Sequence, residues 1–102
     1  MRILHTVNRS PFEKSSLASC LDHALADSAV LLFEDAVYAA LAGSANESLI
    51  ETAGKRVKIY ALGPDLKARG IPPERVIDGV AIVDYEGFVD LTAAHDSVQA
   101  WL

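Results

Sequence analysis

The stretch AVLLF, residues 29–33, decides the fold of this chain. All of its residues are apolar, which predicts a strand buried on both faces, as in the centre of a parallel sheet. The run ends at Glu34-Asp35, and a helical pattern follows over residues 36–42 and stops at Gly43. A buried strand followed directly by a helix is the repeating unit of α/β proteins.

The same alternation continues on both sides of residues 29–33. The other strands are predicted at residues 3–7, 57–62, 80–83 and 97–102. Further helices are predicted at residues 46–53, 65–70 and 85–94, with a short extended piece at 76–77. Strands and helices alternate at intervals of about 20–25 residues, which indicates βαβ units. We therefore expect a single three-layer α/β/α domain over residues 1–102, with a five-stranded, mostly parallel sheet in a flavodoxin-like order.

The first helix has two candidate starting points. Residues 10–13, Ser-Pro-Phe-Glu, have the form of a capping box with proline at the first helical position. Alternatively, Ser15 or Ser16 caps a shorter helix. In either case the pattern predicts a helix that runs to about residue 27. Its apolar face is predicted to consist of Leu17, Cys20, Leu21, Ala24 and Leu25.

The composition excludes several classes of function. A formal net charge of −5 argues against a nucleic-acid platform, because phosphate binding needs clustered lysine and arginine. No stretch approaches the ~18 consecutive apolar residues of a membrane span, and the N-terminus lacks the apolar run of a signal peptide. We therefore expect a cytoplasmic protein with neither nucleic acid nor membrane as a direct partner.

The loops after the predicted strands carry no recognisable cofactor motif. They contain no G-x-G-x-x-G and no Walker pattern. Their acidic residues are predicted to cap the helices that follow: Glu34, Asp35, Asp65 and Asp84. His5, His23 and His95 lack metal-ligand spacing, and His5, on a central strand, is expected to be a hydrogen-bonded core residue. Neither a cofactor nor a metal is expected.

Cys20 is the residue with reactive potential. As the only cysteine it excludes an internal disulfide and a cysteine-based metal site within one chain. Its thiolate could accept sulfane sulfur as a persulfide, and a protonated His23, three residues later on the same helix, would lower its pKa. The competing interpretation is a core cysteine, because Cys20 falls on the apolar face with Leu17 and Leu21.

Five blocks of the chain resemble the TusB/DsrH family. They are ILHTVNRSPF (3–12), LLFEDAVYAA (31–40), YALGPDLKARG (60–70), VDYEGFVDLT (83–92) and the tail VQAWL (98–102). The blocks occur in the family's order and cover nearly the whole chain. A cysteine in the first helix resembles the DsrH-like members more than the Tus-type members, so Cys20 places the chain closer to DsrH.

The resemblance implies a DsrE/F/H-like fold and a subunit of a cytoplasmic persulfide-relay complex. Its expected partners are TusC/DsrF-like and TusD/DsrE-like subunits in a dimer of heterotrimers, with a TusE/DsrC-like protein as the downstream sulfur acceptor. The relay serves 2-thiolation of the wobble uridine of tRNA in one branch and dissimilatory sulfur oxidation in the other. In both branches the principal sulfur-carrying cysteine belongs to the TusD/DsrE-type partner.

Three roles remain open at this point. In the first, Cys20 transiently carries persulfide. In the second, the chain is a non-catalytic subunit that completes the hetero-hexamer, and activity resides in the complex. The third, a stand-alone binding module of flavodoxin type, has no support in the loops. The last predicted strand is an exposed edge that needs covering. Several aromatic residues could fill either the core or an interface: Tyr38, Tyr85, Phe88 and Trp101.

Overall fold

Five parallel strands form a single sheet in the computed structural model, which describes residues 1–12 and 15–102. The strands are β1 (Ile3–Val7), β2 (Ala29–Leu32), β3 (Lys58–Leu62), β4 (Val80–Val83) and β5 (Ser97–Trp101). The α-helices are α1 (Ser16–His23), α2 (Glu47–Gly54), α3 (Gly63–Ala68) and α4 (Tyr85–Ala94). Two 3-10 helices, η1 (Glu34–Ala40) and η2 (Pro73–Arg75), complete the described elements.

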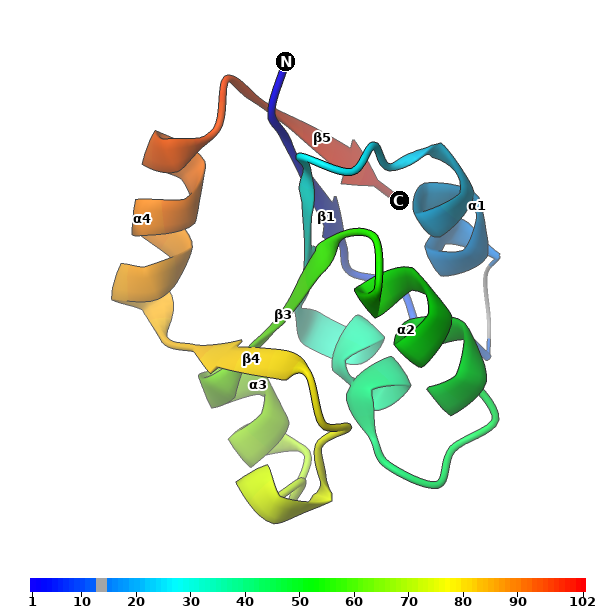
Figure 1. The fold of residues 1–102 in the computed structure, drawn as a ribbon. Helices are drawn as coiled ribbons and strands as arrows, with labels where there is room; N and C mark the ends of the chain where they lie inside the picture. Colours follow the sequence, from blue (N-terminus) through cyan, green and yellow to red (C-terminus); the bar gives the residue numbers. More distant parts are fainter. Residues whose placement is uncertain (13–14) are drawn as a thin grey trace.

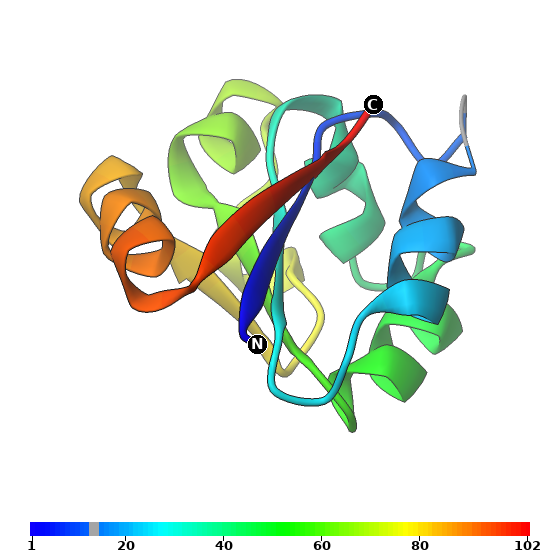
Figure 2. The same ribbon diagram turned by 90° about the horizontal axis from the view of Figure 1, so that it is seen from above.

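The strand order β4-β3-β2-β1-β5 explains how the helices are distributed. From β1 to β4 the chain steps three times in one direction across the sheet, and it then crosses back to pair β5 with β1. Because crossovers are right-handed, the reversed step places its helix on the opposite face. Accordingly, α4 lies alone on one face, with α1 and α2 on the other (Figures 1 and 2). The predicted three-layer α/β/α class is confirmed.

The strand order differs from the flavodoxin order expected from the sequence. In the flavodoxin order, 2-1-3-4-5, β1 lies between β2 and β3. In this chain β1 lies between β2 and β5. The physical reason is that a helical crossover is long enough to deliver its strand to either side of the sheet. The hydrophobic pattern fixes which residues are buried, and it leaves that choice open.

The two faces of the sheet have cores of very different size. The larger core joins β-strand residues such as Val30 and Ile59 to apolar residues of α1, η1, α2 and α3. The smaller core consists of Leu4, Ala29 and Leu31, against which partly buried residues of α4 pack. The α4 side of the sheet is therefore covered thinly.

The first helix follows the shorter of the two predicted alternatives. Ser15 occupies the N-cap position of α1, and Ser10 instead accepts a hydrogen bond from the Phe12 amide at 3.2 Å. The glutamate of the proposed capping box, Glu13, lies outside the described residues. The helix ends at His23, earlier than predicted, because Ala24 is already extended (φ −67°, ψ 130°). Leu25, which was expected on the apolar face, is therefore left 62% exposed.

The segment after β2 also differs from its prediction. Residues 36–42 were expected to form an α-helix, whereas a 3-10 helix, η1, spans Glu34–Ala40. It begins at Glu34 with a positive φ of 50°, a left-handed conformation that costs energy for a residue with a side chain. The remaining predicted helices and strands are present with ends shifted by no more than two residues, and the short extended piece at 76–77 appears as a bridge between Leu41 and Val76.

Candidate functional site

Cys20 is fully buried in the larger core. It lies on α1 between Leu17 and Leu21, and all three side chains point toward the sheet as the helical spacing predicts. Its exposed fraction is 0%. Burial raises the pKa of the Cys20 thiol to about 12, because the thiolate would lose its hydration in apolar surroundings. In the isolated chain the sulfur is therefore a protonated thiol without contact to solvent.

His23 does not activate Cys20 in this structure. Although the two residues are three apart on α1, Cys20 points into the core while the His23 ring is exposed. The Nδ1–H group of His23 donates to the Ser19 carbonyl oxygen at 2.7 Å. No hydrogen bond joins His23 to Cys20 among the described residues. A lowered thiol pKa would require both side chains to move.

The His23 ring lies instead beside Trp101, which belongs to the C-terminal strand. The ring centroids of His23 and Trp101 are 5.7 Å apart, and those of His5 and Trp101 are 6.2 Å apart. Trp101 Nε1–H donates to Nδ1 of His5 at 3.1 Å, so Nδ1 must be unprotonated. Burial, and secondarily the nearby His23, lowers the pKa of His5 and favours this neutral form. The expectation that His5 is a hydrogen-bonded core residue is confirmed.

The carboxyl ends of β2 and β3 are tied together by acidic side chains. Asp65 Oδ2 accepts a hydrogen bond from the Glu34 amide at 2.6 Å. Asp35 Oδ1 pairs with Arg69, accepting from Nη2 at 2.8 Å and from Nε at 3.0 Å. Glu34, which has the left-handed φ of 50°, therefore has its backbone amide bound to a carboxylate of α3. These carboxylates therefore have a structural role within the chain.

The prediction that acidic residues cap the following helices is right for one of four. Asp84 caps α4, since its Oδ1 accepts from the Gly87 amide at 2.8 Å. The prediction is wrong for Glu34, Asp35 and Asp65, because the N-cap positions are Phe33 for η1 and Leu62 for α3, which places these three side chains inside the first turn. They still lie where the helix dipole favours negative charge. The carboxylates of Asp35 and Asp65 bond between η1 and α3, to Arg69 and to the Glu34 amide respectively.

The described residues contain no group of three histidine, cysteine, aspartate or glutamate side chains that could hold a metal ion. None of the described helices is long and apolar enough to span a membrane. At the carboxyl end of β1, Asn8 Oδ1 is the buried side-chain oxygen that lacks a hydrogen-bond partner in the described part of the chain.

Two features of the site escaped the sequence analysis. The contact between His5 and Trp101 joins residues 96 positions apart, and it follows only from the pairing of β5 with β1. A groove with acidic walls lies between α2 and residues 74–80. Its only local signal was the pair Glu47 and Glu51, one helical turn apart.

Fold and site together define a small parallel α/β protein whose single cysteine is buried and in which side chains of the chain itself bridge the carboxyl ends of β2 and β3. A family model described as DsrH like protein matches residues 9–98. Three relatives named Protein TusB are each 36% identical to this chain over 99 residues; they come from Pectobacterium parmentieri, Escherichia coli strain K12 and Shigella flexneri. Each match covers 97% of this chain and 100% of the relative. The chain belongs to the TusB/DsrH family.

Solved structures support the same fold. The ychN protein from E. coli superposes with a TM-score of 0.86 at 25% sequence identity, and the match covers 98% of both chains. The MTH1491 protein from Methanobacterium thermoautotrophicum superposes with a TM-score of 0.72 at 19% identity, covering 96% of both chains. The second likeness concerns the fold alone.

Proposed function

We propose that this chain is the TusB/DsrH-type subunit of a cytoplasmic persulfide-relay complex and that it contributes contact surface, not a reacting thiol. Its partners in this proposal are TusC/DsrF-like and TusD/DsrE-like subunits in a dimer of heterotrimers. The TusD/DsrE-like subunit carries the persulfide and passes it to a TusE/DsrC-like acceptor. Family membership over nearly the whole chain supports the assembly, and the buried thiol of Cys20 supports the division of roles.

The exposed surface of α4 is the observation that carries the structural role. α4 covers one face of the sheet alone, yet none of its ten residues is buried. Tyr85 and Val89, one turn apart on this helix, are 60% and 64% exposed. Exposed aromatic and aliphatic side chains that lie together are typical of the core of a protein–protein interface. A homologous α/β subunit packed against α4 would complete the thin core on this side of the sheet.

The edge of the sheet at β5 supports the same assignment. β5 pairs with β1 on one side only, and its residues Ser97–Ala100 are exposed, with Val98 at 50%. Natural proteins cover such edges or block them with charge, and β5 contains no charged residue. The expected exposed terminal edge is therefore present, and in the proposed complex a partner covers it.

A second candidate function assigns the relay step to Cys20 itself. Its thiolate would attack the outer sulfur of a donor persulfide, forming a Cys20 persulfide while the donor's inner sulfur leaves as a thiolate. The position of Cys20 in the first helix, as in DsrH-like members, favours this role. It requires α1 to move so that the sulfur becomes accessible, because only an accessible thiolate is nucleophilic.

The destination of the sulfur has two alternatives within the proposal. The curated relatives carry the name TusB, which fits the branch that makes 2-thiouridine at the wobble position of tRNA. The family model carries the name DsrH, and a cysteine in the first helix fits the branch that oxidises stored sulfur. Identifying the acceptor protein to which the complex passes its sulfur distinguishes the two.

Co-purification with the neighbouring homologous subunits tests the structural role. Val89→Glu places a charge on the α4 surface and is expected to reduce recovery of the partners at least tenfold, because a desolvated unpaired charge costs several kcal/mol, on the order of 2–5. Leu25→Glu is the matched control, since Leu25 is equally exposed (62%) but lies beyond α1. Loss of assembly in Leu25→Glu with retention in Val89→Glu would place the contact elsewhere.

A further inference from the structure

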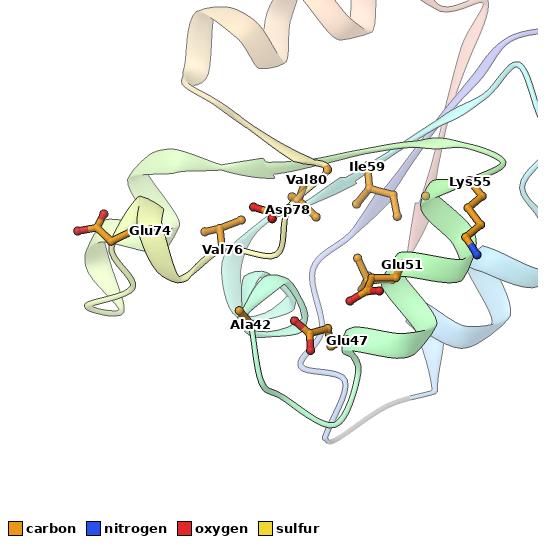
Figure 3. Close-up of a pocket in the computed structure, with 12 residues that line it drawn as sticks. Ala42, Glu47, Glu51, Lys55, Ile59, Glu74, Val76, Asp78 and Val80 are labelled. Carbon is orange, nitrogen blue, oxygen red and sulfur yellow. The ribbon is translucent and has the colours of Figure 1, made fainter.

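A groove of about 580 Å³ lies between α2 and the segment of residues 74–80 that leads into β4 (Figure 3). Its floor is apolar and includes Ile50, Ile59, Val76 and Val80. This volume lies within the roughly 300–1,000 Å³ that is typical of ligand sites. No lining residue belongs to α1 or α4, so the groove is separate from Cys20 and from the proposed subunit contact.

Both walls of this acidic groove carry carboxylates. Glu47 and Glu51 lie one turn apart on α2, Asp78 stands on the opposite wall, and Glu74 lies at the outer end (Figure 3). Four carboxylates and the ammonium group of Lys55 give the lining a formal charge of −3, more than half of the −5 of the whole chain. The described residues form no ion pair in the groove, because the ion pair that they do form joins Arg69 to Asp35.

The groove opens onto an unpaired strand edge. β4 begins at Val80, which lines the groove, and it has β3 as a strand neighbour on one side only. Residues 79–83 carry no charge, and Ile82 is 40% exposed. An uncharged strand edge is a template for a further strand. Pairing begins beyond Val80, because the Val80 amide already donates to the Ile77 carbonyl oxygen at 3.1 Å. A segment that leaves the groove can therefore continue along β4 in an extended conformation.

We propose that the acidic groove and the edge of β4 dock an extended, basic segment of a partner protein. Lysine or arginine side chains of the segment lie against the carboxylates of Glu47, Glu51 and Asp78, and its apolar side chains lie on the floor. Charge complementarity selects a basic occupant, because a neutral or acidic segment would leave these carboxylates unpaired on desolvation. The free edge of β4 selects a polypeptide, because main-chain hydrogen bonds are what such an edge offers.

Fluorescence anisotropy with the full chain tests this proposal. The probe is a short labelled peptide of alternating valine and lysine. Two variants remove charge that faces the lysines: the double variant Glu47→Gln/Glu51→Gln on one wall, and Asp78→Asn on the other. Each variant is expected to weaken binding of the peptide about tenfold. Glu86→Gln/Asp90→Asn is the matched control for the first variant. It neutralises two acidic residues one turn apart on α4, so it changes the net charge equally, and it should alter binding less than twofold.

Equal weakening by the groove and control variants would overturn the proposal, since binding would then follow the net charge alone. Two modified peptides test the roles of the apolar floor and of the β4 edge. Replacing valine by serine removes the apolar contacts, and N-methylation of alternate residues removes the backbone donors; each is expected to weaken binding at least fivefold. Unchanged binding of the N-methylated peptide, or full displacement of the peptide by an equal concentration of spermidine, would contradict docking of an extended polypeptide.

Discussion

At Cys20, the burial of one sulfur atom separates the two roles considered for this chain. A relay cysteine needs a thiolate that a donor persulfide can reach, whereas a core cysteine needs only to fill space. The sequence placed Cys20 on the apolar face of a helix, and the structure shows it fully buried there. The residue type alone could not decide between these roles, because both use the same helical position.

Alkylation of Cys20 in the native chain is expected to be very slow. With a thiol pKa of about 12, the thiolate fraction near pH 8 is on the order of 10³-fold lower than for an ordinary cysteine. Reaction with iodoacetamide, followed by mass spectrometry, measures this rate, and the denatured chain serves as the control. Native and denatured rates within a few fold of each other would show that the sulfur is accessible.

The bond between Trp101 and His5 predicts how stability depends on pH. The pKa of His5 is lowered in the folded state, so the unfolded chain binds more protons between that lowered pKa and about 6.5. The contribution of His5 is therefore fully present above about pH 6.5 and is lost as the pH falls through its folded pKa. Protonated Nδ1 can no longer accept from Trp101 Nε1–H.

Urea unfolding followed by Trp101 fluorescence measures this effect. Lowering the pH from about 7.5 to 5.5 is expected to lower the free energy of unfolding of the native chain. His5→Gln keeps an acceptor but cannot titrate, so its decrease should be smaller. His23→Gln leaves the Trp101–His5 bond in place, so its free energy of unfolding should still decrease as the pH is lowered. An identical pH dependence in the native chain and in His5→Gln would exclude His5 as the source.

At the scale of elements, close contact between α4 and β4 depends on Gly87. A Cβ atom at Gly87 would lie 2.9 Å from Cβ of Val83, closer than real Cβ contacts allow, and Val83 Cβ cannot rotate away. Gly87→Ala is expected to lower the free energy of unfolding by about 1–3 kcal/mol, because α4 must shift on the sheet. Urea unfolding measures the change.

Gly54 provides the control for this prediction. It is the last residue of α2, and a Cβ atom there would meet nothing within 4 Å. Gly54→Ala is therefore expected to be neutral or to raise the free energy of unfolding by up to about 1 kcal/mol, since alanine favours the helix. A similar loss in both variants would mean that the contact with Val83 is not the cause.

The elements could be predicted from the sequence wherever one local pattern decides. The expected strand at residues 80–83 and the expected helix at residues 85–94 are both present. Here the apolar pattern and the helix cap at Asp84 indicate the same boundary between strand and helix. The prediction was wrong where tertiary contacts decide. Asp65 binds the amide of Glu34, the first residue of η1, and this segment forms a 3-10 helix in place of the predicted α-helix.

For the whole molecule, the sequence could predict the class of fold but not the contacts that define its surfaces. The strand order, the pairing of His5 with Trp101 and the acidic groove all bring together residues from distant parts of the chain. Hydrophobic patterns report which residues are buried, not which neighbours they meet. The chain thus presents two separate surfaces: α4 and the acidic groove lie on opposite faces of the sheet, and β5 and β4 form its two opposite edges.

Persulfide mapping in the assembled complex tests the central claim most directly. The chain is co-expressed with its homologous subunits, the complex is loaded with a sulfane-sulfur donor, and the modified cysteines are identified by peptide mass spectrometry. We expect one added sulfur on the cysteine of the TusD/DsrE-like partner and none on Cys20, with equal transfer to the acceptor by the Cys20→Ser complex. A sulfur on Cys20 that disappears when the downstream acceptor is added would contradict the structural role and make Cys20 a relay station.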